Sequence, residues 1–296
     1  MKKNKLALWL CIIFVLILAG LICFDLNYEK TKAMSMDKEM LQILANDKAQ
    51  QVNQFLAFQK EKLLSLASLD IFKEAFLHPD DASKLVAVKK IIDGLGGTEA
   101  LFTPNGILIY ATNAPVGVDY SKNPYFISKE KKIIFMTYYD LYEKKYFYTL
   151  IGPVYDSQEK DKVIGVVGFH TPLDEISNLL KETDENKNTE VYLIDGDGLL
   201  LSSSKYIDVA NNGGILTQEI KSDGAKDCLN DFKKYTADGS VMPHSEEVTE
   251  YLNYMGYEVF GAHSCVPFVS GCVIAEEKVG ESSMFSIADF IKKIFN

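Results

Sequence analysis

Two hairpin signals constrain the fold of this chain more than any other feature of its sequence. The first is "EALFTPNGILIYAT" (99–112), where Asn105-Gly106 separates two runs of strand-forming residues. The second is "EVYLIDGDGLLLSSS" (190–204), where a glycine-containing turn plays the same part. Three strand patterns follow each hairpin, at 132–140, 144–156 and 162–171 and then at 245–253, 257–266 and 271–277. The chain is therefore predicted to contain two similar antiparallel sheets in tandem, and the fold class is α+β.

Helical patterns surround the two sheets. Residues 35–76 contain no glycine or proline and predict one long helix, with apolar residues at helical spacing: Leu41, Leu44, Val52, Phe55, Leu63 and Leu66. "HPDD" ends this pattern, and 82–97 predicts a second helix that ends in glycines. A short helix is expected after the first sheet, and a polar helical insert near 215–236 within the second. The long helix can pack on its own domain and also form a dimer seam on another face.

Residues 6–24 carry no charge and are long enough to cross a bilayer as a helix. Lys2, Lys3 and Lys5 place the N-terminus in the cytoplasm. A cleaved signal peptide is the alternative, but the apolar run is longer than the usual signal core and no small-x-small cleavage site follows it. We therefore expect a single uncleaved anchor, with the rest of the chain outside the cytoplasm and no cytoplasmic output domain.

Charge and composition exclude several functions. The net charge of −10 argues against nucleic acid as a partner, because phosphate binding requires a basic surface. The sequence contains no arginine, so the bidentate guanidinium that commonly binds carboxylate or phosphate is missing. Any anionic ligand must be bound by lysine, histidine, hydroxyl groups or backbone N–H groups.

Four segments follow one another along the chain: "GVDYSKNPYF", "KVIGVVGFHTPLDEIS", "VYLIDGDGLLLSSS" and "EEKVGESSMF". Together they resemble the double Cache family, the tandem PAS-like extracytoplasmic sensor domains of bacterial and archaeal chemoreceptors and sensor histidine kinases. The resemblance implies two tandem PAS-like antiparallel-sheet domains, a small-molecule ligand in the membrane-distal domain, and no enzymatic activity. The implied organisation is a cytoplasmic tail (1–5), a transmembrane helix (6–24), a long membrane-exit helix (25–76), a distal ligand-binding domain (77–189), a proximal domain (190–279) and a C-terminal amphipathic helix (280–296).

The resemblance also implies a ligand site. Tyr125 and Phe126 match aromatic positions of amino-acid-binding members, and Asn123 stands where those members have an arginine. Tyr138 and Asp140 match a tyrosine-x-aspartate pair. His170 replaces a late aspartate, and Tyr120 belongs to the same aromatic-rich zone. Since the carboxylate clamp and one ammonium partner are missing, an ordinary α-amino acid is not the expected ligand. Simple packing of these aromatic residues and of His170 remains the alternative.

The cysteines and one acidic loop are considered as sites for a disulfide or a bound metal. Cys265 and Cys272 can form a disulfide across a short hairpin and leave Cys228 unpaired, while three separate thiols are the alternative. A zinc site from His263, Cys265 and Cys272 lacks a fourth ligand. A calcium loop near 184–195 has Thr189 at the required glycine position. We therefore expect no metal, no cofactor and no catalytic residues.

The function predicted from these features is that of a membrane-anchored extracytoplasmic small-molecule sensor without its own output domain. The expected partners are a small ligand, the membrane, a second copy through the long helix and a separate signalling membrane protein. A non-signalling surface protein that binds a solute or supports an envelope assembly is the alternative.

Overall fold

The computed structural model describes residues 38–95, 98–111, 115–128, 132–140, 143–159, 161–181, 189–207, 214–238 and 248–279. The predicted tail, the predicted transmembrane helix (6–24) and the predicted C-terminal helix (280–296) lie outside these ranges. Within them, no helix combines the length and the apolar character needed to cross a bilayer.

The N-terminal part of the described chain is a helix over residues 38–68. The prediction of one unbroken helix through Phe76 is wrong, because Leu69 has an extended backbone, with φ −66° and ψ 130°. A second helix, α2 (Asp70–Leu77), begins immediately, and the Leu69 carbonyl accepts its first amide hydrogen bonds. No glycine or proline marks the break, so periodicity alone could not locate it. α2 buries Phe72, and α3 (Ala82–Leu95) follows where the second helix was predicted.

The first sheet contains five antiparallel strands in the order β2-β1-β5-β4-β3. The strands are β1 (Thr98–Phe102), β2 (Leu108–Ala111), β3 (Ile134–Asp140), β4 (Lys145–Tyr155) and β5 (Val163–Pro172). The predicted hairpin is confirmed: Gly106 lies in the turn between β1 and β2 with φ +91°, a conformation that glycine adopts without steric cost. The short helix α4 (Pro124–Ile127) lies between β2 and β3, and α5 (Asp174–Leu180) leaves the sheet.

The second sheet repeats this order. Its strands are β6 (Thr189–Ile194), β7 (Thr249–Leu252), β8 (Glu258–Val266) and β9 (Gly271–Lys278), arranged as β6-β9-β8-β7. Leu200 forms a bridge with Ile194, which places the second arm of the predicted hairpin beside β6, in the position of β2 in the first sheet. The prediction of two similar sheets in tandem is therefore confirmed. Helix α6 (Asp223–Asp238) forms most of the predicted insert, and a 3-10 turn (Pro267–Val269) joins β8 to β9.

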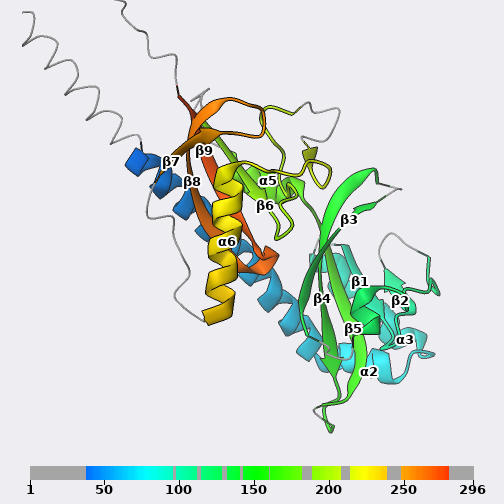
Figure 1. Ribbon diagram of the computed structural model, residues 1–296. Coiled ribbons are helices and arrows are strands. Elements are labelled where there is room, and N and C mark those ends of the chain that lie inside the picture. Colours follow the sequence, from blue (N-terminus) through cyan, green and yellow to red (C-terminus); the bar gives the residue numbers. More distant parts are fainter. Residues whose placement is uncertain are drawn as a thin grey trace, which may run out of the picture.

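The long helix packs along both sheets, which lie one after the other beside it (Figure 1). Its buried residues recur every three or four positions for most of its length and belong to one continuous core: Leu41, Ala45, Ala49, Val52, Leu56, Leu63 and Leu66. Near its start, the Gln42 side chain donates a hydrogen bond to the His263 carbonyl of the second sheet at 3.4 Å. Further along, Phe55 lies edge-on to Tyr148 of the first sheet, with ring centroids 6.3 Å apart. One helix thus joins the cores of the two sheets.

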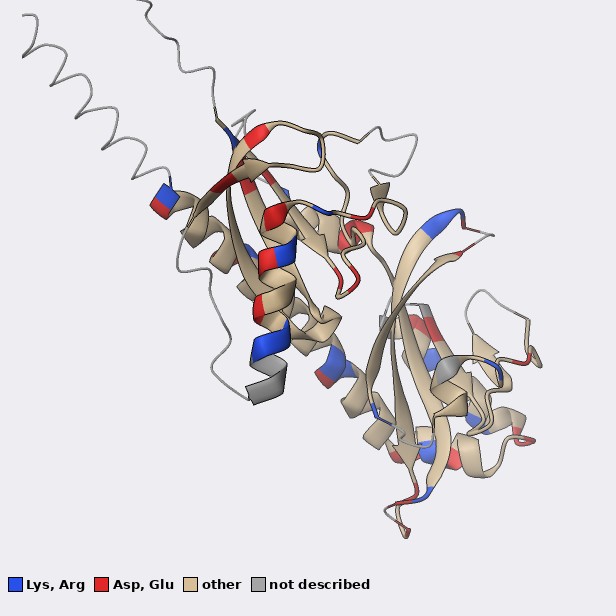
Figure 2. Cartoon of the chain, in the orientation of Figure 1, with Lys and Arg blue, Asp and Glu red and all other residues tan. Residues whose placement is uncertain are grey.

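Each sheet has a second face, away from the long helix, because successive side chains of a strand point to opposite sides. In the second sheet this face is covered by α6, which packs on Ile194, Cys272 and Ile274. In the first sheet it carries a separate apolar cluster beneath the segment that contains α4. Charged residues of both signs alternate along α6, and the strands are mainly uncharged (Figure 2).

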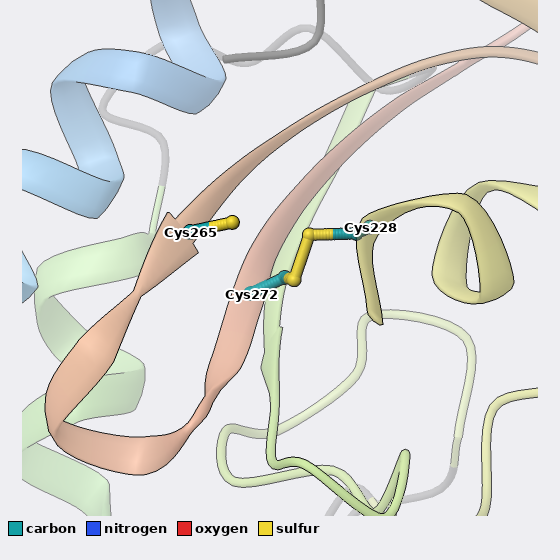
Figure 3. A group of neighbouring side chains, drawn as sticks. All are labelled: Cys228, Cys265 and Cys272. Atoms are coloured by element: carbon teal, nitrogen blue, oxygen red, sulfur yellow. A yellow bond between two sulfur atoms is a disulfide. The ribbon is translucent and has the colours of Figure 1, made fainter. Parts of the chain in front are cut away.

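The predicted Cys265–Cys272 disulfide is wrong. Cys272 of β9 is bonded instead to Cys228 of α6, with the two Cα atoms 6.4 Å apart, and Cys265 is a buried free thiol (Figure 3). Cys265 and Cys272 are directly opposite each other in the β8–β9 register, as the prediction required. The helical insert near 215–236 was predicted, but its position over the sheet was not. α6 lies over this face of the sheet and brings Cys228 to Cys272. The bond joins α6 to the sheet across 44 residues of chain.

A pair of alanine substitutions isolates the contribution of this bond. Cys272→Ala removes the disulfide, and we expect it to lower the free energy of unfolding by about 3–4 kcal/mol, because it releases a long closed loop in the unfolded chain. Cys265→Ala is the matched control: it removes a buried sulfur from the neighbouring strand and is expected to cost only about 1 kcal/mol. Urea unfolding under non-reducing conditions measures both values, and equal losses would contradict the observed pairing.

Candidate functional site

The first sheet carries a cavity of about 330 Å³ on the face away from the long helix. This volume is within the range of small-molecule pockets. The cavity is lined by Glu99, Ala100, Phe102, Leu108, Ala111, Tyr120, Asn123, Phe126, Met136, Tyr138, Asp140, Glu143, Phe147, Thr149, Ile151 and His170. Its floor comes from all five strands, and its cover comes from the segment between β2 and β3.

Strand register sorts the floor into rows of different polarity. Phe102 lies opposite Leu108 in one row, and Ile151 shares the next row with the two alanines of the lining. The following row contains Thr149 opposite His170. Beyond it lie Tyr138, opposite Phe147, and then Asp140 at the end of β3. The cavity is therefore apolar at one end and polar, then acidic, at the other.

Three polar side chains meet in the middle of this floor. His170 Nδ1 lies 2.9 Å from the hydroxyl of Tyr138 and 2.9 Å from that of Thr149. The Tyr138 ring stacks on Phe147, with centroids 5.9 Å apart, and lies edge-on to the His170 ring. Since both hydroxyls are directed to Nδ1, Nε2 is the ring nitrogen that remains for a ligand. His170 is thus held in one orientation by residues of β3 and β4.

Burial keeps His170 neutral. It lowers the pKa of His170 to about 4, and the nearby Asp140 carboxylate opposes this shift without overcoming it. Burial also raises the pKa of the Tyr138 hydroxyl well above its usual value. At neutral pH both groups are therefore uncharged, and each can donate or accept a hydrogen bond.

Two of the three acidic residues in the lining, Asp140 and Glu143, are at the acidic end. The third, Glu99, has its carboxylate 3.9 Å from Lys62 Nζ of the long helix. Asp140 Oδ1 accepts a hydrogen bond from the backbone N–H of Glu143 at 2.8 Å, which closes the turn after β3. Lys145 lies opposite Asp140 in the register, but its side chain is exposed and does not line the cavity. Among the described residues the lining contains no lysine.

All predicted ligand-binding residues except Tyr125 line this cavity. Tyr125 is buried beneath the cover and packs edge-on against Phe126, with ring centroids 5.2 Å apart. Asn123 lines the cavity, and its Oδ1 also accepts a hydrogen bond from the backbone N–H of Tyr125 at 2.9 Å, which orders the start of α4. A ligand contact for each of these residues stays a prediction.

Sequence reasoning missed the contributions of β1, β2 and β4, including Phe102, Thr149 and Ile151. Alternation along β4 could have found Phe147, Thr149 and Ile151, which share one face of the strand. It could not have shown which face carries the cavity, because nearly all of β4 is buried.

The sulfur atoms of Cys228, Cys265 and Cys272 lie within 4.8 Å of one another. In the described part of the chain, this is the group of side chains whose ligand atoms are close enough to bind a metal ion. Two of these sulfurs are bonded to each other, so they do not offer thiolates. His263, the other residue of the zinc site considered above, has its Nε2 3.5 Å from Asp231 Oδ2. The arrangement is that of a disulfide beside a buried thiol.

A second polar group lies between the second sheet and α6; we name Glu190, Tyr192, Tyr251, Tyr254 and Glu276 the acid–tyrosine cluster. Glu276 is 1% exposed, and its Oε1 accepts hydrogen bonds from Tyr192 at 2.7 Å and Tyr251 at 2.9 Å. Glu190 accepts hydrogen bonds from the Tyr254 hydroxyl at 2.8 and 2.9 Å. Burial, together with the neighbouring Glu190, raises the pKa of Glu276 to about 7. Hydroxyl donors therefore compensate in part for burying two acids.

Comparisons with known proteins agree with this architecture. No family model matches the sequence, and no curated protein matches it. Among solved structures, the sensor domain of the Vibrio cholerae histidine kinase DctB matches with a TM-score of 0.59 at 11% identity, over 82% of this chain and 97% of that one. These matches include domains of the double Cache type and extend over most of the chain. The chain has the double Cache fold.

Two chemoreceptor domains show the same double Cache architecture. The sensory domain of the Campylobacter jejuni chemoreceptor Tlp3 (CcmL), solved with isoleucine bound, has a TM-score of 0.56 at 16% identity and covers 84% of this chain and 96% of its own. The ligand-binding domain of the Pseudomonas aeruginosa PAO1 chemoreceptor PctC, in complex with GABA, has a TM-score of 0.55 at 13% identity, over 81% and 99%. At these identities the likeness establishes the double Cache fold and leaves the ligand open.

The protonation of His170 can be tested by NMR. We expect a histidine pKa near 4, because burial disfavours the imidazolium, and a further decrease in Asp140→Asn, because the Asp140 carboxylate favours the charged ring. Asp161→Asn, an equal change of charge at an exposed site, is expected to leave the value unchanged. Titration of isotope-labelled histidines, assigned with His170→Gln, measures the pKa. A value near 6.5 would contradict a closed environment.

Glu276 gives a pH dependence of defined sign. Its pKa is higher in the folded chain, so between about pH 4.5 and pH 7 the folded state binds more protons than the unfolded state, and stability falls as pH rises. Relative to Glu276→Gln, the wild-type free energy of unfolding should fall by roughly 2 kcal/mol across this range. Denaturant unfolding at several pH values measures the difference, with Glu250→Gln, exposed on β7, as control. A difference independent of pH would contradict the shift.

Proposed function

We propose that this chain is a membrane-anchored extracytoplasmic sensor domain that binds a small molecule in the cavity of the first sheet. The observation that carries the proposal is the position of the cavity: it lies on one face of a single sheet, and the long helix packs on the other face. The similar structures support it, since they include a histidine kinase sensor domain and chemoreceptor domains solved with isoleucine and GABA.

Adjacent residues connect the two faces. His170 lines the cavity, and the next side chain back along β5, Phe169, points to the opposite face, where the Lys62 ammonium lies 5.0 Å from its ring centroid. Lys62 Nζ is also 3.9 Å from the carboxylate of Glu99, which is buried on β1. A ligand that moves β1 or β5 therefore moves groups in contact with the long helix. The ligand shifts the helix only as far as it binds two helix positions unequally.

The long helix also has a face suited to a second copy of the chain. Met40 and Phe58 are five helical turns apart and thus share a face, and they are 65% and 67% exposed. Ile43, 59% exposed, lies next to Met40 on this face. Exposed apolar residues in such an arrangement favour a parallel helix pair, through which movement could pass toward residues 6–24 and on to a separate signalling protein.

A pocket-filling variant tests ligand binding. We expect at least one compound among amino acids, carboxylates, amines and purines to raise the melting temperature. At a free ligand concentration of a hundred times its Kd, the free energy of unfolding should increase by about 2.7 kcal/mol. Ala111→Phe fills the cavity from the edge strand and should abolish the shift. Ala82→Phe, exposed at the start of α3, should retain it. A ligand that stabilises all three proteins equally binds elsewhere.

Distance measurements between two copies test signalling in the same system. With a spin label at position 40, the distance distribution between the long helices should change when the ligand is added. Ligand binding that leaves this distribution unchanged would favour the non-signalling solute-binding function.

A further inference from the structure

We propose that the three buried cysteines of the second sheet form a thiol–disulfide exchange site that releases α6. The Cys265 thiolate attacks the sulfur of Cys272, the Cys228–Cys272 bond breaks as the new bond forms, and Cys228 leaves as a thiolate that takes up a proton. One thiol and one disulfide are present before and after the step, so it requires no oxidant or reductant. The observed pairing is the resting state, and the exchange does not depend on ligand binding in the first sheet.

The three sulfur atoms are close enough for this reaction. They lie within 4.8 Å of one another, and the Cys265 side chain points toward the bonded pair from the neighbouring strand (Figure 3). Cys265 and Cys272 are directly opposite each other in the β8–β9 register. Directly opposite residues of antiparallel strands have Cα atoms about 4.5–5.5 Å apart, within the range of roughly 4.4–6.8 Å that a disulfide spans. The exchanged bond therefore fits the strand positions that are already present.

Burial keeps the exchange slow while α6 is in place. Cys265 is 1% exposed, and both cysteines of the bond are fully buried. Burial raises the pKa of the Cys265 thiol to about 11, and the Asp231 carboxylate of α6 adds to this shift. The attacking thiolate is therefore rare in the resting state. Movement of α6 away from the sheet would hydrate the thiol, lower its pKa and speed the attack.

The exchange changes what holds α6 to the sheet. The observed bond joins α6 to β9 across 44 residues, whereas the exchanged bond closes only the short β8–β9 hairpin. Noncovalent contacts, such as that of Asp231 with His263, then remain between α6 and the sheet. The new bond lies on β8, where the Cys265 carbonyl accepts a hydrogen bond from Asn53 of the long helix at 3.4 Å. The cysteine pairing therefore acts on a strand that contacts the long helix.

Mapping of the cysteine pairing in the full chain tests the exchange. The protein in lipid nanodiscs is incubated without oxygen or reductant, in urea below the unfolding transition so that α6 can move. Its thiols are then blocked with a label, and the labelled cysteines are located by mass spectrometry. We expect the label to move from Cys265 to Cys228 with time while the total label stays constant. If no label reaches Cys228, the proposal is wrong.

Two variants separate the exchange from other reactions. Cys265→Ala lacks the attacking thiol, so Cys228 should stay unlabelled; equal labelling of Cys228 in this variant would mean that another reaction opens the bond, against the proposal. Cys228→Ala leaves the two residues of the exchanged bond, and mild oxidation should join Cys265 to Cys272. If both stay unbonded, the strand geometry does not permit the exchange. The wild-type mapping does not depend on the folding of either variant.

Hydrogen exchange measures the release of α6. The backbone amides of α6 should exchange about tenfold faster or more in oxidised Cys228→Ala than in Cys265→Ala. Each variant lacks one sulfur, but only Cys265→Ala retains the bond between α6 and β9. The amides of β4 in the first sheet should be equally protected in both. Equal protection of α6 would show that the bond does not hold this helix in place, and the proposed release would be wrong.

Discussion

The packing of one helix against two sheets is the constraint on which the rest of this structure depends. The apolar stripe of residues 38–68 belongs to the core of both sheets, and in the first sheet Phe76 of α2 packs on the same face, against β5. Burial of each large side chain in the stripe contributes roughly 1.5–3 kcal/mol. The contact is close: a Cβ at Gly152 of β4 would lie 2.8 Å from Leu63 Cδ2. A change in the shape of the first sheet at β4 would therefore displace side chains of the helix.

The two sheets use their other faces differently, although their strand order is the same. In the second sheet this face is closed by α6, the Cys228–Cys272 disulfide and the acid–tyrosine cluster. In the first sheet the corresponding face is only partly covered, and the cavity lies there. The same strand order thus supports one sheet closed by a disulfide-bonded helix and one sheet with a cavity, and the proposed ligand site is in the second of these.

The polar groups of the two sheets also differ in how they are compensated. Glu276 and Glu190 are each hydrogen-bonded by tyrosine hydroxyls, so the second sheet stores buried acids that need no outside partner. In the cavity of the first sheet, the hydroxyls of Tyr138 and Thr149 are directed instead to His170, which is uncharged at neutral pH.

The sequence by itself determined the tandem α+β fold, because hairpin turns and alternating strands are local signals from which the positions of β1 to β5 could be predicted. The resemblance to the double Cache family added six residues of the cavity lining, including Tyr138 and His170, but none from β1, β2 or β4. Only the tertiary structure decided what covers each sheet face. Cys272 pairs with Cys228 because α6 packs over β9, and Tyr125 is buried because α4 turns it inward. Such contacts join segments far apart in the chain, and no local pattern encodes which of two faces they meet.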